Sequence, residues 1–163
     1  MAIRVLIADP DPTLLASYEA RLSQEGLEVR TVRNGLDCLD ALHTFEPDVL
    51  VLEPEMPWGG GEGVLDVMHD VYELPLVPVF VITSHETFAR LNLRQFPLVT
   101  HMQTKPVGPD ELVRLIRHIA NEPQPRVEDL RKSTASPAKN RRKVDVRVGW
   151  AVSVGNRLIG VRS

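Results

Sequence analysis

The feature that most constrains the fold of this chain is a regular alternation of short apolar runs with segments of helical periodicity. The apolar runs occupy residues 3–8, 27–32, 49–52, 77–82 and 98–103, and a helix-like pattern follows each of them. Short, nearly continuous apolar runs are typical of strands buried on both faces, and parallel strands need a crossover that is usually a helix. The sequence therefore predicts an α/β domain with a doubly wound, five-stranded parallel sheet.

The alternation ends after residue 122, where polar sequence with several prolines begins. Residues 123–143 have the composition of a linker. Residues 144–163 alternate apolar and polar positions around a Gly155-Asn156 turn. We therefore expect three parts: an α/β domain at 1–122, a linker at 123–143 and a short β-hairpin extension at 144–163.

The charge is divided between an acidic body and a basic tail. Formal charges sum to −10 over residues 1–125 and to +7 over residues 126–163. A basic cluster of this kind can contact nucleic-acid phosphates, but solvated linkers share its composition, and the tail contains no helix-turn-helix pattern. We therefore do not expect a nucleic-acid partner. The alternatives are that the tail docks on its own acidic domain, or that the hairpin covers a sheet edge or a second subunit of a homodimer. The cluster consists of Lys139, Arg141, Arg142 and Lys143.

Several classes of protein are excluded by simple counts. The chain has one cysteine, Cys38, so no disulfide can form within it. The N-terminal apolar run is too short for a signal peptide, and no stretch approaches the roughly 18 apolar residues of a membrane span. We expect a cytoplasmic protein that is not inserted in a membrane.

Three smaller features are expected to be structural. Cys38 lies among leucines and is predicted to be a small core residue. The run Gly59-Gly60-Gly61-Glu62-Gly63 lacks the Gly-Lys-Ser/Thr ending of a phosphate-binding loop and is predicted to be a flexible loop. The histidines are dispersed without the spacing of metal ligands, so we do not expect them to bind a metal; they are His43, His69, His85, His101 and His118.

Acidic, hydroxyl and lysine side chains follow the predicted strands. The carboxyl ends of parallel strands meet at one edge of the sheet, so these side chains are expected to converge there. Carboxylates hold a hard divalent cation, and a hydroxyl and an ammonium group can contact phosphoryl oxygens. The pattern predicts a site that handles phosphoryl groups. Its candidate residues are Asp9, Asp11, Glu53, Glu55, Thr83, Ser84 and Lys105.

These strand ends resemble the receiver domain of bacterial two-component response regulators over about residues 3–121. The matching segments are Val5 to Asp9, Leu52 to Pro57, Val81 to Ser84 and Thr104 to Pro106. The most specific parts are the Met56-Pro57 pair after the third strand and the Lys105-Pro106 pair after the fifth. The resemblance implies a flavodoxin-like sheet of strand order 2-1-3-4-5. It also implies phosphorelay signal transduction, in which an aspartate is phosphorylated with magnesium present and a histidine kinase or a downstream effector is the partner.

The phosphoryl-handling positions of the family carry over only in part. Thr83 and Lys105 match the residues that contact the phosphoryl group, but the phosphoacceptor aspartate falls on Glu53. A glutamate is one methylene longer, so its carboxylate is expected roughly 1.5 Å beyond the attack position. It can instead reach Lys105 and imitate the charged state.

The metal and switch positions depart from the family as well. Asp9 matches the first member of the acidic pair that holds the metal, but Pro10 replaces the second. The aromatic switch position falls on Met102. Losing a carboxylate at position 10 weakens the expected magnesium site, because Mg²⁺ is held mainly by oxygen ligands.

We therefore interpret the chain as a pseudo-receiver, a protein-interaction module without enzymatic activity. A phosphorylation-competent receiver is the first alternative. The second is a phosphatase, because Asp9-Pro10-Asp11-Pro12-Thr13 fits the Asp-x-Asp-x-Thr signature of haloacid-dehalogenase-like phosphatases. In that family Asp9 would be the nucleophile and Asp11 the general acid.

Overall fold

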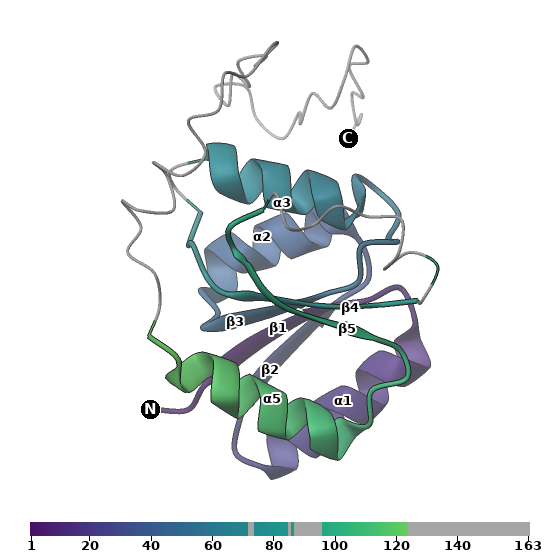
Figure 1. Cartoon of the computed structure of the whole chain (residues 1–163), viewed down its shortest axis with the longest axis vertical. Coiled ribbons are helices and arrows are strands. Elements are labelled where there is room, and N and C mark those ends of the chain that lie inside the picture. Colours follow the sequence, from purple (N-terminus) through teal and green to yellow (C-terminus); the bar gives the residue numbers. More distant parts are fainter. Residues whose placement is uncertain (72–73, 85, 87–95, 124–163) are drawn as a thin grey trace.

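The computed structural model describes residues 1–71, 74–84, 86 and 96–123. Within these residues the chain alternates strands and helices, and the fold class predicted from the sequence is confirmed (Figure 1). The expected helix at 85–95, the linker and the β-hairpin lie largely or wholly outside the described residues. The elements are β1 (Arg4–Ala8), α1 (Pro12–Gln24), β2 (Glu28–Val32), α2 (Gly35–Phe45), β3 (Val49–Leu52), α3 (Gly60–Asp70), β4 (Val79–Thr83), β5 (Val99–Thr104) and α5 (Pro109–Asn121).

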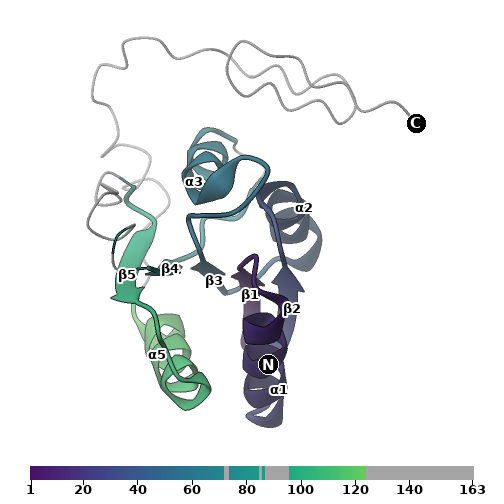
Figure 2. The same cartoon turned by 90° about the vertical axis from the view of Figure 1, so that its right-hand side faces the viewer.

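The strands form one five-stranded sheet in the order β2-β1-β3-β4-β5, and every strand pair is parallel. Helices α1 and α5 lie on one face of the sheet, and α2 and α3 lie on the other (Figures 1 and 2). Because successive strand side chains point to opposite faces, each central strand contributes to both cores. In β1, Val5 and Ile7 pack towards α1 and α5, whereas Leu6 and Ala8 pack towards α2 and α3.

Local capping chemistry starts the first two helices. The Asp11 carboxylate accepts hydrogen bonds from the backbone N–H groups of Thr13 and Leu14, and Pro12 occupies the first turn, where no N–H is needed. The Asn34 side chain accepts from the backbone N–H of Asp37 at the start of α2. None of the described helices is long and apolar enough to cross a membrane.

The glycine-rich run after β3 is not a loop, and that prediction is wrong. It forms the first turn of α3, which begins at Gly60. The reason is a close approach between backbones: the Gly61 N–H donates to the Pro54 carbonyl at 2.9 Å, and a Cβ atom on Gly61 would lie 2.6 Å from Pro54 Cα. Only glycine lets this helix start so close to the residue that follows Glu53.

Strand β5 is irregular at its beginning. The register changes from Val79–Val99 to Phe80–His101, which leaves Thr100 as the extra residue of a bulge. The bulge changes which side chains face each side of the sheet. Val99 and Met102 both pack against the core beneath α2 and α3, although an odd and an even position would face opposite ways in a regular strand.

Candidate functional site

Four of the predicted site residues come together at the carboxyl-terminal edge of the sheet. Asp9 follows β1, Glu53 follows β3, Thr83 ends β4 and Lys105 follows β5. Asp9, Glu53 and Thr83 are the buried polar residues among those that the structure describes. The backbone of the strand ends holds them in place: the Glu53 N–H donates to the Ala8 carbonyl, and the Lys105 N–H donates to the Thr83 carbonyl.

Lys105 bridges the two buried carboxylates. Its Nζ lies 2.6 Å from Asp9 Oδ2 and 3.0 Å from Glu53 Oε2, and both carboxylate side chains are only 6% exposed. Burial by itself would lower the pKa of Lys105, but the hydrogen bonds and charges of Asp9 and Glu53 outweigh it and raise that pKa above its ordinary value. The ammonium group is therefore held charged between the two acids.

The Glu53 carboxylate is surrounded by hydrogen-bond donors. Thr83 Oγ1 donates to Glu53 Oε1 at 2.7 Å, and the backbone N–H of Glu55 donates to the same oxygen at 3.0 Å. The other oxygen, Oε2, faces Lys105. Both oxygens of Glu53 are thus engaged by groups of the protein.

The loop after β1 supplies one carboxylate to the site, that of Asp9, and not the two that an acidic pair would supply. Asp9 Oδ1 accepts the backbone N–H of Asp11 at 2.9 Å, while Oδ2 pairs with Lys105. Pro10 has no carboxylate, and the Asp11 carboxylate caps α1. A hard divalent cation would therefore find Asp9 already bonded at both oxygens, with no second acid from this loop beside it.

Comparison with known proteins identifies the family to which this arrangement belongs. Residues 5–117 match the family described as response regulator receiver domain. The chain belongs to the response regulator receiver domain family.

Relatives of this receiver domain include complete regulators. The DNA-binding transcriptional regulator NtrC of Klebsiella pneumoniae is 31% identical over 134 residues, which are 79% of this chain and 28% of that protein. The response regulator MprA of Mycobacterium bovis is 26% identical over 135 residues, 83% of this chain and 57% of that protein. The chain thus spans little more than a quarter of its NtrC relative.

Solved structures show the same fold. The chemotaxis response regulator CheY4 of Vibrio cholerae superposes with a TM-score of 0.64 at 18% identity, covering 73% of this chain and 99% of that one. The strand order 2-1-3-4-5 that the resemblance implied is the order found here.

The remaining predicted positions of the receiver domain lie around the central cluster. The Glu55 side chain is exposed, although its backbone N–H bonds Glu53, and Ser84 is half-buried next to Thr83. Met102 lies half-buried in β5 and packs on the core beneath α2 and α3.

Tyr18 supports the site in a way that the sequence analysis missed. This residue of α1 is 1% exposed, and its hydroxyl donates to the Val107 carbonyl at 2.9 Å. Since Val107 lies two positions after Lys105, the bond ties the segment that carries the lysine to α1. In the sequence, Tyr18 is simply one of the apolar positions of an amphipathic helix.

Burial of the Tyr18 phenol makes the stability of the chain fall at alkaline pH. Burial chiefly raises the pKa of Tyr18 from 10.0 to about 12. The folded chain therefore keeps the phenol proton that the unfolded chain loses above pH 10, and the stabilisation, complete below pH 10, is lost between pH 10 and 12. We expect the free energy of unfolding to fall by about 2 kcal/mol through this group. Urea unfolding between pH 9 and 12 tests this: Tyr18→Phe should show a shallower decline, and equal declines would contradict the assignment.

Proposed function

We propose that this receiver domain acts in phosphorelay signalling as a pseudo-receiver, a protein-interaction module whose state is not set by phosphorylation of the acceptor position. The partner would be a histidine kinase or a downstream effector, the two classes of protein with which receiver domains interact. The observation that carries the proposal is the state of the Glu53 carboxylate, which we assign to the acceptor position: both of its oxygens are bonded to groups of the protein.

The contacts of Glu53 oppose phosphoryl transfer for two reasons. A carboxylate must present a free oxygen in line with the phosphorus atom, whereas Glu53 Oε1 accepts from Thr83 and Oε2 pairs with Lys105. These are also the two side chains that the family uses to hold the transferred group. Misplacement of a reacting atom by about 1 Å costs on the order of a hundredfold in rate, and a glutamate adds one methylene of misplacement.

The metal site of the family is weakened in the same way. Receiver domains bind Mg²⁺ at the acidic site of phosphorylation. The donors present here fit that ion poorly, because Pro10 supplies no oxygen side chain and both oxygens of Asp9 already accept hydrogen bonds. We derive no reaction step through magnesium. We expect millimolar Mg²⁺ to leave the unfolding midpoint of the chain unchanged.

Acetyl phosphate tests the proposal directly. We expect the chain incubated with acetyl phosphate and Mg²⁺ to show no phosphoryl adduct by intact-protein mass spectrometry under mild pH. The matched variant is the double substitution Glu53→Asp with Pro10→Asp, which restores the acceptor length and the second acid. It should gain an adduct that requires Mg²⁺ and maps to position 53.

The incubations of the unchanged chain and of the double variant distinguish a pseudo-receiver from a phosphorylation-competent receiver. A Mg²⁺-dependent acyl phosphate on Glu53 of the unchanged chain would show a phosphorylation-competent receiver and refute the proposal. A double variant that remains unmodified would refute the argument that positions 10 and 53 are what block the reaction.

The phosphatase hypothesis receives no support from the geometry. It needs Asp11 as a general acid facing the substrate side of Asp9, but Asp11 Oδ1 accepts the N–H groups of Thr13 and Leu14 as the cap of α1. An acceptor held by two backbone donors is stabilised as the anion, which disfavours donation of a proton. The family match is to receiver domains over residues 5–117.

A further inference from the structure

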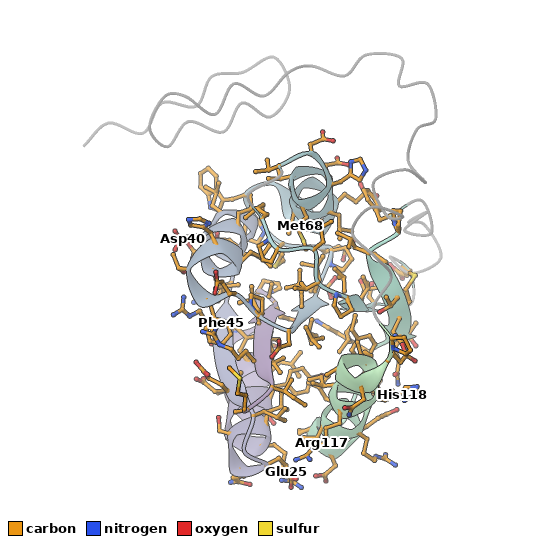
Figure 3. All side chains as sticks on the ribbon, turned by 90° about the vertical axis from the view of Figure 1, so that its left-hand side faces the viewer. Glu25, Asp40, Phe45, Met68, Arg117 and His118 are labelled. Carbon is orange, nitrogen blue, oxygen red and sulfur yellow. The ribbon has the colours of Figure 1, made fainter. Side chains whose placement is uncertain are left out.

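Two histidines that are far apart in the sequence meet at the edge of the sheet. His101 lies in β5 and His118 in the last turn of α5, and their rings lie 6.0 Å apart in an edge-to-face arrangement. Glu122, at the C-cap of α5, completes the group: one ligand atom from each residue lies within 4.8 Å of the other two. Figure 3 shows His118 on α5, and β5 lies beside that helix. The spacing of the histidines along the chain gave no sign of this group.

The bulge in β5 places His101 on this side of the sheet. Because the register changes at Thr100, His101 pairs with Phe80 and its ring packs edge-on against the Phe80 ring at 6.4 Å. Phe80 belongs to the core beneath α1 and α5, so His101 faces α5. Thr100 also contributes directly, since its Oγ1 lies 3.1 Å from His101 Nδ1. That contact leaves His101 Nε2 for a ligand, and a partner on the second ring nitrogen is typical of metal-bound histidines.

The separations between the ligand atoms suit a small tetrahedral ion. His118 Nε2 lies 3.0 Å from Glu122 Oε1, and His101 Nε2 lies 3.8 Å from the same oxygen. Zinc takes nitrogen and carboxylate ligands at about 2.0–2.2 Å, which sets the ligand atoms roughly 3.3–3.5 Å apart in a tetrahedron. The two distances to Glu122 Oε1 bracket that range, and all three ligand atoms lie within 4.8 Å of one another, so the rings need only small rotations to reach the spacing of a bound ion. Two imidazoles and one carboxylate form a set that favours Zn²⁺ over Mg²⁺, which prefers oxygen ligands.

The group is also open to solvent. The side-chain exposures are 28% for His101, 67% for His118 and 37% for Glu122. These exposures give an ion access to the ligand atoms from solvent. The ordinary alternative for such residues is an ion pair between His118 and Glu122 one helical turn apart, but that pair does not account for the approach of His101 from another element.

We propose that His101, His118 and Glu122 form a zinc-binding site that joins β5 to the end of α5. The ion would cross-link two elements at the edge of the sheet. The site lies on the face of the sheet that α5 covers, opposite to the face on which Met102 packs. It is separate from the Asp9–Glu53–Lys105 cluster and does not depend on the pseudo-receiver proposal.

Zinc titration of the full chain, stripped of metal by a chelator, tests the site. We expect saturation at one Zn²⁺ per chain by isothermal titration calorimetry and a melting temperature that rises with Zn²⁺ concentration, because the ion binds the folded chain. In NMR spectra of the imidazole rings, the signals of His101 and His118 should shift over the same range of Zn²⁺ concentration. His101→Ala, His118→Ala and Glu122→Gln should each weaken zinc binding by at least about tenfold.

The controls use the other histidines. His69 lies 2.9 Å from Asp70, so it offers a histidine beside a carboxylate that is not one of the three proposed ligands. His69→Ala and His85→Ala should leave the zinc affinity unchanged, and Mg²⁺ in excess should not displace zinc. Absence of saturable binding, full affinity in His118→Ala, or NMR shifts confined to other histidines would each overturn the proposal.

Discussion

Replacing Lys105 with methionine is expected to destabilise the receiver domain by about 3–5 kcal/mol, because it leaves two buried carboxylates without their shared cation. Asp9 and Glu53 are each 6% exposed at the side chain, and Lys105 Nζ contacts both. Methionine keeps most of the side-chain volume, so the loss is electrostatic. Urea unfolding at pH 7 measures it.

Arg21→Met is the matched control for Lys105→Met. Arg21 also bridges two acids, Glu25 and Asp110, at 2.6 Å each, but its side chain is 35% exposed and that of Asp110 is 78% exposed. Water screens such a pair, so its loss should change the stability much less than the loss of Lys105. Equal effects of the two substitutions, or a Lys105→Met chain as stable as the original, would contradict the view of Lys105 as the required counter-charge.

Gly61→Ala is expected to destabilise the chain by about 2 kcal/mol, although alanine favours helices. The new Cβ would lie 2.6 Å from Pro54 Cα. Because a Cα atom is part of the backbone and a Cβ atom is fixed to it, neither atom can move away by a side-chain rotation. The strand end that carries Glu53 would have to move with Pro54. The free energy of unfolding in urea measures the cost.

Gly63→Ala should have the opposite sign. Gly63 lies in the same helix, and nothing lies within 4 Å of a Cβ added there. The same substitution then gains only helix propensity, which stabilises by roughly 0.5–1 kcal/mol. If both substitutions stabilise the chain, the close approach of α3 to Pro54 does not exist in solution.

Some features of this fold and site could be predicted from the sequence. Asp11 and Pro12 could be identified as a helix start because capping involves groups within three residues of one another. The convergence of Asp9, Glu53, Thr83 and Lys105 was also predictable, since a parallel sheet necessarily brings its strand ends to one edge. The expected contact between Glu53 and Lys105 is present at 3.0 Å.

The glycine-rich segment shows where such reasoning fails. A run of glycines is expected to be flexible when only the intrinsic preference of glycine is considered, because glycine loses more conformational freedom on folding than any other residue. Gly61 is instead required by its close approach to Pro54, which lies in the connection between β3 and α3. The pattern of residues along the chain does not show that approach. Tyr18 is a similar case, because its hydrogen-bond acceptor, Val107, belongs to the far end of the chain.

The sequence by itself determined the layers of this protein, the order of its elements along the chain and the chemistry at the strand ends. Each follows from periodicity or from groups that are neighbours in the chain. Only the tertiary structure decided that Lys105 is shared by two acids, that α3 begins within the glycines and that His101 faces His118. The physical reason is that each depends on contacts between groups that are not neighbours in the chain: the ends of three strands at Lys105, the approach of two backbones at Gly61, and the extra residue at Thr100 that turns His101 towards α5.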